Sequence, residues 1–166
     1  MSLNKITTCL WYNTEGEEAA KHYTSIFANS SIDHIQYYVP GGQEIHGKPA
    51  GSVMTVSFTL NGHPFVALNG GPHCKHSEAV SFQIECKSQE EVDYYFEKLS
   101  EGGDEKKQEC GWLADKFGVS WQVVPKQLLD YLKEGTKEQQ SRVTNAMLKM
   151  KKMNIEGLRK AFEGEE

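Results

Sequence analysis

The 166-residue sequence lacks the features that mark secreted, membrane-spanning and disulfide-stapled proteins. No apolar run approaches the roughly 18 to 20 residues that cross a bilayer, and the first residues show no secretory pattern of charge, apolar stretch and small-residue cleavage site. There is no CxxC pair, so we expect reduced thiols at Cys9, Cys74, Cys86 and Cys110. These absences favour a cytoplasmic chain with no membrane partner.

The sequence also lacks an excess of basic charge. Its formal net charge of -5 argues against nucleic-acid binding, which depends on a basic surface that displaces phosphate counterions. The segment from Lys126 to Glu166 is richer in basic residues, but Lys and Glu are interspersed there as on a solvated helix face. Seven Phe, seven Tyr and three Trp supply enough apolar material for one folded domain. Small neutral or mildly charged ligands therefore fit better than polyanions.

The first half of the chain predicts one strand, one helix and three further strands. Residues 6–12 alternate as a strand, and Thr14 to Glu17 matches a capping box that predicts a helix start. A buried helix face, through about residue 28, is indicated by Ala19, Ala20, Tyr23, Ile26 and Phe27. Extended segments are expected at residues 32–39, 53–60 and 63–69. Because Asn and Gly both tolerate positive φ, Asn61-Gly62 predicts a hairpin between the last two.

The pattern starts again near Ala79. A strand is expected at residues 80–86, a second capping box at Ser88 to Glu91, and a helix with an apolar face formed by Val92, Tyr95, Phe96 and Leu99. The capping boxes are offset by 74 residues and the apolar helix positions by 73. The two repeats must therefore differ by one residue between these features. Gly102-Gly103 ends the helix. Further extended segments are expected at residues 105–112 and 119–124, with a strand or turn at residues 113–117.

After Pro125 the sequence becomes helical. Apolar residues recur at helical spacing at Val143, Met147, Met150, Ile155, Leu158 and Phe162. Methionines in such a stripe are typical core or interface residues rather than ligands. The segment therefore predicts a C-terminal helical extension.

Several stretches carry a resemblance to a known group: ITTCLWYNTEGEEAAKHYTSIF, FVALNGGPH, AVSFQIEC, CGWLADKFGVSWQVVP and AMLKMKKMNIEGLRKAF. Nearly the whole chain resembles the PhnB-like, or 3-demethylubiquinone-methyltransferase-like, branch of the glyoxalase, bleomycin-resistance and extradiol-dioxygenase superfamily. The resemblance implies an α+β fold in which two tandem βαβββ modules form a half-open barrel, or cup. It places the glyoxalase-like domain at residues 1–125, with modules at about 4–71 and 79–125, and the extension at 126–166. It also implies a homodimer.

Metal-using members of that superfamily carry ligands, typically His and Glu, on the first and last strand of each module. The matching positions here are Thr7, Ser81, Gln122 and Ala67, the last of which shifts to Asn69 if the hairpin is longer. Neutral hydroxyl, methyl and amide groups do not hold a first-row divalent ion against water. We therefore expect no metal centre of this type and no cofactor.

The same resemblance defines a ligand-binding cup. Strand alternation places the neighbours of Thr7 and Ser81 on the same faces, which gives a lining of Thr7, Cys9, Trp11, Asn69, Ser81, Gln83, Glu85, Trp112 and Gln122. Such a mixture of aromatic and hydrogen-bonding groups suits flat organic ligands. The alternative is that these polar positions only face solvent. Glu85 is the one ionisable group of the lining, so it is the candidate general base if a reaction occurs.

Three other patterns are weighed against plainer interpretations. His73 and His76 form one couple of potential zinc ligands, whereas structural zinc sites use two, so a linker is favoured. Cys110 would need a nearby base to act as a nucleophile, and a packed strand cysteine is favoured. The glycine pairs lack the GxG spacing of nucleotide-type folds, which argues against methyl transfer from S-adenosylmethionine.

Three functions remain open at this point. The leading hypothesis is metal-free binding of a small, aromatic or flat organic molecule. The second is an enzyme of unassigned reaction that uses Glu85 or a metal held by residues outside the family positions. The third is a structural or interaction module whose cup no longer binds a ligand.

Overall fold

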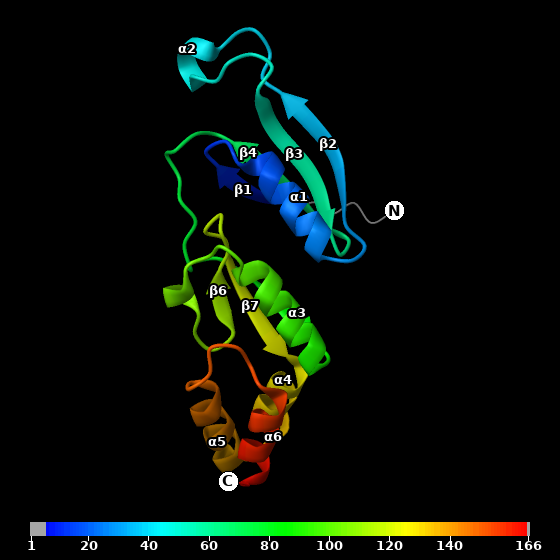
Figure 1. The fold of residues 1–166 in the computed structure, drawn as a ribbon, viewed down its shortest axis with the longest axis vertical. Coiled ribbons are helices and arrows are strands. Elements are labelled where there is room, and N and C mark those ends of the chain that lie inside the picture. Colours follow the sequence, from blue (N-terminus) through cyan, green and yellow to red (C-terminus); the bar gives the residue numbers. More distant parts are fainter. Residues whose placement is uncertain (1–5, 166) are drawn as a thin grey trace. The chain divides into compact units, whose positions relative to one another are not determined.

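The computed structural model describes residues 6–165 and confirms the mixed α+β class. The chain divides into two compact units, with the boundary between Lys75 and His76. Within the described residues there are six α-helices and two separate sheets, of four and three strands, neither of which closes into a barrel (Figure 1).

The first unit has the βαβββ order that the sequence predicts. It contains β1 (Thr8–Tyr12), α1 (Gly16–Ile26), β2 (Ser31–Tyr37), β3 (Val53–Leu60) and β4 (His63–Asn69). A short helix that was not predicted, α2 (Gln43–His46), lies between β2 and β3. The strands are ordered β1-β4-β3-β2, and β1 runs parallel to β4. The hairpin at Asn61-Gly62 is confirmed, because both residues have positive φ, 46° and 81°.

Helix α1 covers one face of the first sheet (Figure 1). Its buried residues Ala19, Tyr23 and Ile26 are three of those expected from the periodicity, and the Tyr23 ring stacks on Phe58 of β3 at 6.3 Å. Burying aromatic side chains of this size is a main source of stability for a small unit.

The capping box expected at Thr14 is wrong. The N-cap residue is Glu15, and no side chain of the helix's own sequence caps it. Instead, the amide of Gly16 donates to the Oδ1 atom of Asn69 at 2.8 Å, so a residue at the end of β4 satisfies the first turn of α1. Local pattern reasoning found the helix start but could not reveal a cap 53 positions away.

The second unit begins with β5 (Ser81–Cys86) and α3 (Gln89–Ser100) and continues through a 3-10 turn (Glu105–Lys107) to β6 (Trp112–Ala114) and β7 (Ser120–Pro125). The strands are ordered β5-β7-β6, with β5 parallel and β6 antiparallel to β7. The strand expected at residues 105–112 is wrong, so this sheet has three strands where the repeat predicted four.

A tight turn explains the missing strand. Cys110 and Gly111 both have positive φ, 52° and 80°, and they reverse the chain so that Glu109 pairs with Trp112. Two consecutive residues with positive φ are typical of the turns that join hairpin strands. The extended segment expected at residues 105–112 is therefore a 3-10 turn followed by a hairpin corner.

The one-residue mismatch of the repeat lies in the turn before α1. The N-cap residues Glu15 and Ser88 are 73 positions apart, as are the buried helix residues, whereas the strand ends Tyr12 and Cys86 are 74 apart. One hydrogen bond of the capping box expected at Ser88 is confirmed, because the Ser88 side chain accepts from the amide of Glu91.

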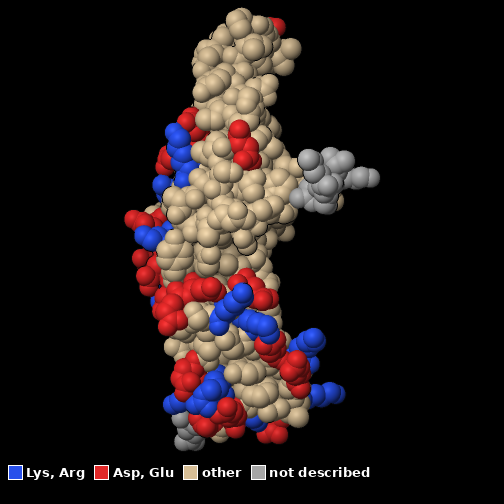
Figure 2. Space-filling model, turned by 90° about the vertical axis from the view of Figure 1, so that its right-hand side faces the viewer, with Lys and Arg blue, Asp and Glu red and all other residues tan. Residues whose placement is uncertain are grey.

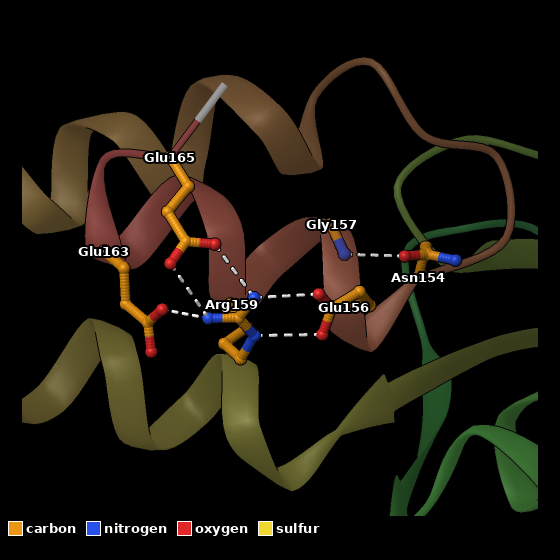
Figure 3. Close-up of polar contacts among 6 residues, drawn as sticks. All are labelled: Asn154, Glu156, Gly157, Arg159, Glu163 and Glu165. Atoms are coloured by element: carbon orange, nitrogen blue, oxygen red, sulfur yellow. Dashed lines mark hydrogen bonds and ion pairs between the residues drawn. The ribbon is translucent and has the colours of Figure 1, made fainter.

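The C-terminal helices belong to the second unit. They are α4 (Lys126–Glu134), α5 (Lys137–Met147) and α6 (Ile155–Glu163), with Val143, Met153 and Leu158 buried among them. Figure 2 shows positive and negative side chains mixed over the end of the chain that these helices form. In α6, Arg159 bridges Glu156, Glu163 and Glu165, and Asn154 caps the first turn (Figure 3). Across residues 6–165, none of the helices combines the length and apolar character needed to span a membrane.

Candidate functional site

One face of the second sheet collects most of the predicted site residues. Neighbouring residues in a strand point to opposite faces, and paired residues point to the same face. The face that packs toward α3 is apolar and includes Cys86, Leu113, Trp121 and Val123, each 2% exposed or less. The opposite face, which we call the polar face, carries Ser81, Gln83, Glu85, Trp112, Ala114, Ser120, Gln122 and Val124.

The strand register arranges the polar face in rows. Trp112, Gln122 and Gln83 lie side by side across β6, β7 and β5, and the next row is Ala114, Ser120 and Ser81. The two rows are linked because the Nε2 atom of Gln122 donates to the Oγ atom of Ser81 at 2.8 Å. That bond holds the amide nitrogen of Gln122, whose strand partner on β6 is Trp112.

A pocket of about 630 Å³ lies at the β6 side of the polar face. Trp112, Leu113, Ala114 and Ser120 contribute to its wall from the sheet, Cys110 from the tight turn before β6, and Met147 and Leu148 from the end of α5. The charged residues at its border are Glu78, Lys106, Lys107 and Glu109. The volume falls within the range of small-molecule sites, roughly 300 to 1,000 Å³.

A second pocket, of about 440 Å³, adjoins the first and shares Glu78, Lys107, Ala114 and Ser120 with it. Its wall is more polar and includes His76, Asp104 and Lys116. Asp115 also borders it, but that carboxylate is 3% exposed and accepts from the amides of Phe117 and Val119 and from the indole of Trp121. Asp115 therefore organises the loop between β6 and β7.

The predicted residues of the first unit lie differently. Cys9 and Trp11 share the face of β1 that points away from α1, where they neighbour Val66 and Leu68 of β4. The Trp11 indole donates to the carbonyl oxygen of Gly71 at 2.7 Å, which ties the ring to the turn after β4. Thr7 is exposed just before β1.

Asn69 lies on the face of β4 that points toward α1. It is 5% exposed, and besides accepting from Gly16 it donates through Nδ2 to the carbonyl oxygen of Val53 at 3.1 Å. Both ends of the amide are thus engaged within the fold. The structure gives Asn69 an internal role in joining α1, β3 and β4.

The register also identifies the last-strand position of the first unit. Ala67 pairs with Leu10 on the face toward α1, so the residue that matches Gln122 on the opposite face is Val66. An isopropyl group offers no donor to a metal, as is the case for the methyl group of Ala67. No group of three His, Cys, Asp or Glu residues within the described part of the chain is arranged to hold a metal ion. His73 is exposed near the end of the first unit, and His76 is half-buried at the start of the second.

The candidate nucleophile and base do not form a reactive pair. Cys110 lies in the tight turn rather than in a strand, and desolvation followed by the charge of Glu109 raises the pKa of its thiol. A raised pKa leaves little thiolate at neutral pH. Glu85 is exposed near the end of β5 and is not part of the wall of either pocket.

A model of the protein family described as 3-demethylubiquinone-9 3-methyltransferase matches residues 4–124, well over half of the chain. The chain belongs to this family. A putative 3-demethylubiquinone-9 3-methyltransferase, PhnB protein, from Bacillus cereus is 34% identical, and the match covers 74% of this chain and 99% of that one with a TM-score of 0.62. No curated protein sequence matches the chain.

Two further solved structures are similar to this family member. A protein from Staphylococcus aureus is 32% identical, with 74% of this chain and 97% of that one covered and a TM-score of 0.33. Protein PA1353 from Pseudomonas aeruginosa is 19% identical, with 72% and 96% covered and a TM-score of 0.54, which bears on the fold alone.

Of the wall of the larger pocket, the predicted lining contained only Trp112; the residues it missed include Ala114 and Ser120 of the sheet and Met147 and Leu148 of the extension. The first two follow from strand pairing once β6 is placed correctly. The other two belong to the helical extension, where the methionine stripe was interpreted as core or interface. No local signal distinguishes a methionine that lines a pocket from one that fills a core.

Proposed function

We propose that this family member binds a flat, largely apolar organic molecule at the larger pocket beside the polar face. The observation that carries the proposal is the row of Trp112, Gln122 and Gln83 next to a pocket of about 630 Å³. An indole ring offers a large apolar surface at a small cost in conformational entropy, and a few fixed amide and hydroxyl groups orient the bound molecule.

The proposal assigns separate roles to the residues. Trp112 stacks on the ring system of the ligand, and Gln122, held by Ser81, accepts a hydrogen bond from its edge. Gln83 is exposed beside Gln122 and extends the polar row. The cup residues proposed from the first unit, Cys9 and Trp11, present a more apolar surface that includes Val66 and Leu68.

Binding is proposed to need no metal ion. The side chains at the family's ligand positions are neutral, with Ser81 and Gln122 in the second unit and Thr7 and Val66 in the first. Elemental analysis of the purified protein tests this directly. A stoichiometric transition metal that survives dialysis would contradict the proposal.

Methyl transfer, which the family description names, is the second candidate. The turns that open α1 and α3 carry Thr14-Glu15 and Lys87-Ser88 rather than a glycine-rich loop, and Glu17 and Glu18 place negative charge in the first turn of α1. The glycine-rich turn that lets a nucleotide-like cofactor approach the start of a helix is therefore missing at both positions. Calorimetry with S-adenosylmethionine tests the point, since saturable binding would favour transfer over binding alone.

A thermal-shift screen with flat aromatic metabolites and antibiotics tests the proposed function. A ligand that binds only the native state raises the unfolding temperature with its concentration. We expect hits whose shift is lost in Trp112→Ala and reduced in Gln122→Ala, which neighbours Trp112 across the strands, while Glu85→Gln leaves it unchanged because Glu85 lies outside both the pocket wall and the row of Trp112 and Gln122. Hits that respond to none of these variants would place binding elsewhere.

The proposed assembly is a homodimer, as the resemblance implies. Light scattering of the purified chain would give about twice the 18.7 kDa monomer mass. A single species at the monomer mass would show that no second subunit contributes to the site.

A further inference from the structure

We infer that the C-terminal extension forms a wall of the ligand pocket, and that Met147 and Leu148 select the apolar body of the bound molecule. This inference rests on the proposed function. It assigns a binding role to a segment of the chain that lies outside the family match, which ends at residue 124.

The larger pocket is built from two sources. Trp112, Ala114 and Ser120 come from the family domain, whereas Met147 ends α5 and Leu148 is its C-cap residue. Leu148 is 56% exposed and borders the pocket. An exposed apolar residue beside an apolar ring is favourable when a ligand covers both.

Backbone hydrogen bonds hold this wall in place. The amide of Cys110 donates to the carbonyl oxygen of Met150, and the amide of Gly111 donates to that of Lys151, both at 2.8 Å. The loop that follows Leu148 is thus paired with the same tight turn that leads into Trp112. The two sides of the pocket, Leu148 and Trp112, are therefore positioned by one set of bonds.

Side chains add a second anchor on α3. Gln89 donates through Nε2 to the carbonyl oxygen of Met153 and accepts from the amide of Ile155. Lys152 pairs with Asp93 at 2.7 Å and with Glu97 at 3.2 Å. A segment fixed at both the turn and the helix is preorganised, which lowers the entropy lost when a ligand binds.

The shared domain and the extension are separate parts of the chain. The Bacillus cereus protein is covered almost entirely, at 99%, by only 74% of this chain. The family match ends at residue 124, so the extension lies outside the part of the chain that the family model describes. A pocket wall made of methionine and leucine favours apolar ligands, whereas a polar wall does not. The unbranched methionine side chain also adapts to irregular ligand shapes.

The test is a fluorescence titration of the full chain with anilinonaphthalenesulfonate, an aromatic probe that carries one sulfonate. We expect the affinity of Met147→Ala/Leu148→Ala to fall about tenfold and that of Leu148→Ala about threefold, because each truncation removes apolar contact area. Trp112→Ala should also weaken binding about tenfold. The matched control is Val80→Ala, an apolar residue of the same unit that is 70% exposed and outside both pocket walls, and it should change affinity less than twofold.

The outcomes separate the two proposals. If Trp112→Ala weakens binding while the double variant binds like the parent chain, the role of the extension is overturned and the proposed function stands. If neither variant weakens binding, both are overturned. Because Met147 is half-buried, circular dichroism and the unfolding temperature are recorded for each variant. If the double variant is unfolded, the exposed Leu148→Ala decides the result alone.

Discussion

At the scale of single residues, Asn69 shows how one amide organises the first unit. Its Oδ1 atom accepts from Gly16 at the start of α1, and its Nδ2 atom donates to Val53 at the start of β3. Since the side chain is 5% exposed, truncation leaves both partners without their bond in a site with little access to water. The consequence of its loss can therefore be predicted.

We expect Asn69→Ala to lower the free energy of unfolding by about 1 to 3 kcal/mol, the usual cost of leaving buried polar groups unsatisfied. Urea unfolding followed by circular dichroism measures it. Asn69→Asp is the matched variant, because it keeps an acceptor near the positive end of α1 and loses only the donor, so it should cost less. Equal midpoints for the parent chain and Asn69→Ala would contradict the assigned role.

Cys86 predicts a pH dependence of stability. Burial, followed by the charges of Glu91 and Glu85, raises the pKa of this thiol from 9.0 to about 12. Above pH 9 the unfolded thiol loses its proton while the folded thiol keeps it, so the folded state binds more protons and stability falls as pH rises from 9 toward 12. The slope from this group is at most about 1.4 kcal/mol per pH unit.

The measurement compares unfolding midpoints of the parent chain and Cys86→Val across that range. The other titrating groups are common to both proteins, so the variant should lose less stability with rising pH. In addition, the buried Cys86 should resist thiol reagents that label the exposed Cys74 in the folded protein. A pH profile identical in the two proteins would show that Cys86 ionises normally in the fold.

The sequence correctly predicted which helix residues are buried, because burial there follows the helical periodicity. Tyr23, Phe96 and Leu99 are buried as the helical spacing indicates. The prediction was wrong by one position at Ala67, because a shift of one residue moves a side chain to the other face of a sheet. Only the pairing of Leu10 with Ala67 shows which face that residue occupies.

At the scale of elements, the turn at Cys110-Gly111 determines how the second sheet ends. A Cβ atom at Gly111 would lie 2.7 Å from the carbonyl oxygen of Val123, and φ at this position is 80°. Both the contact and the positive φ require glycine. Sequence patterns predict an extended segment here, because Cys110-Gly111 is not one of the Asn-Gly or Asp-Gly pairs that mark most such hairpins.

We expect Gly111→Ala to cost about 2 to 4 kcal/mol, since the strain of a positive φ is added to a backbone clash. Gly47→Ala is the control, because φ is 67° there and no atom lies within 4 Å of the added methyl group. It should cost about 1 kcal/mol, which is the strain alone. Denaturant unfolding of the two variants measures the difference, and equal losses would remove the contact with Val123 from the account.

The extension is held by an element-level contact that can be tested separately from binding. Gln89→Ala removes the two hydrogen bonds that α3 makes with Met153 and Ile155, so hydrogen exchange in residues 148–155 should become several-fold faster. The control is Lys98→Ala, an exposed position of the same helix. Unchanged exchange in Gln89→Ala would mean that the bonds to the tight turn suffice to hold this segment.

At the scale of the whole molecule, the repeat predicted from the sequence is real but unequal. Strand, turn and helix recur from the first unit to the second, and the family match covers both. The second unit differs by a lost strand and by three added helices, and the end of one of these helices, α5, borders its larger pocket. Repetition could be predicted from periodicity, whereas the pocket is lined by residues of β6 and of the end of α5, which no sequence pattern brings together.

The central claim is that a flat ligand stacks on Trp112 at this pocket. The indole N–H signals in a nitrogen-15 correlation spectrum test it most directly, with anilinonaphthalenesulfonate as the probe. We predict a saturable shift of the Trp112 signal, while Trp121, which is 2% exposed and bonded to Asp115, moves little and serves as the internal reference. A Trp112 signal that stays in place while the probe binds would contradict the account.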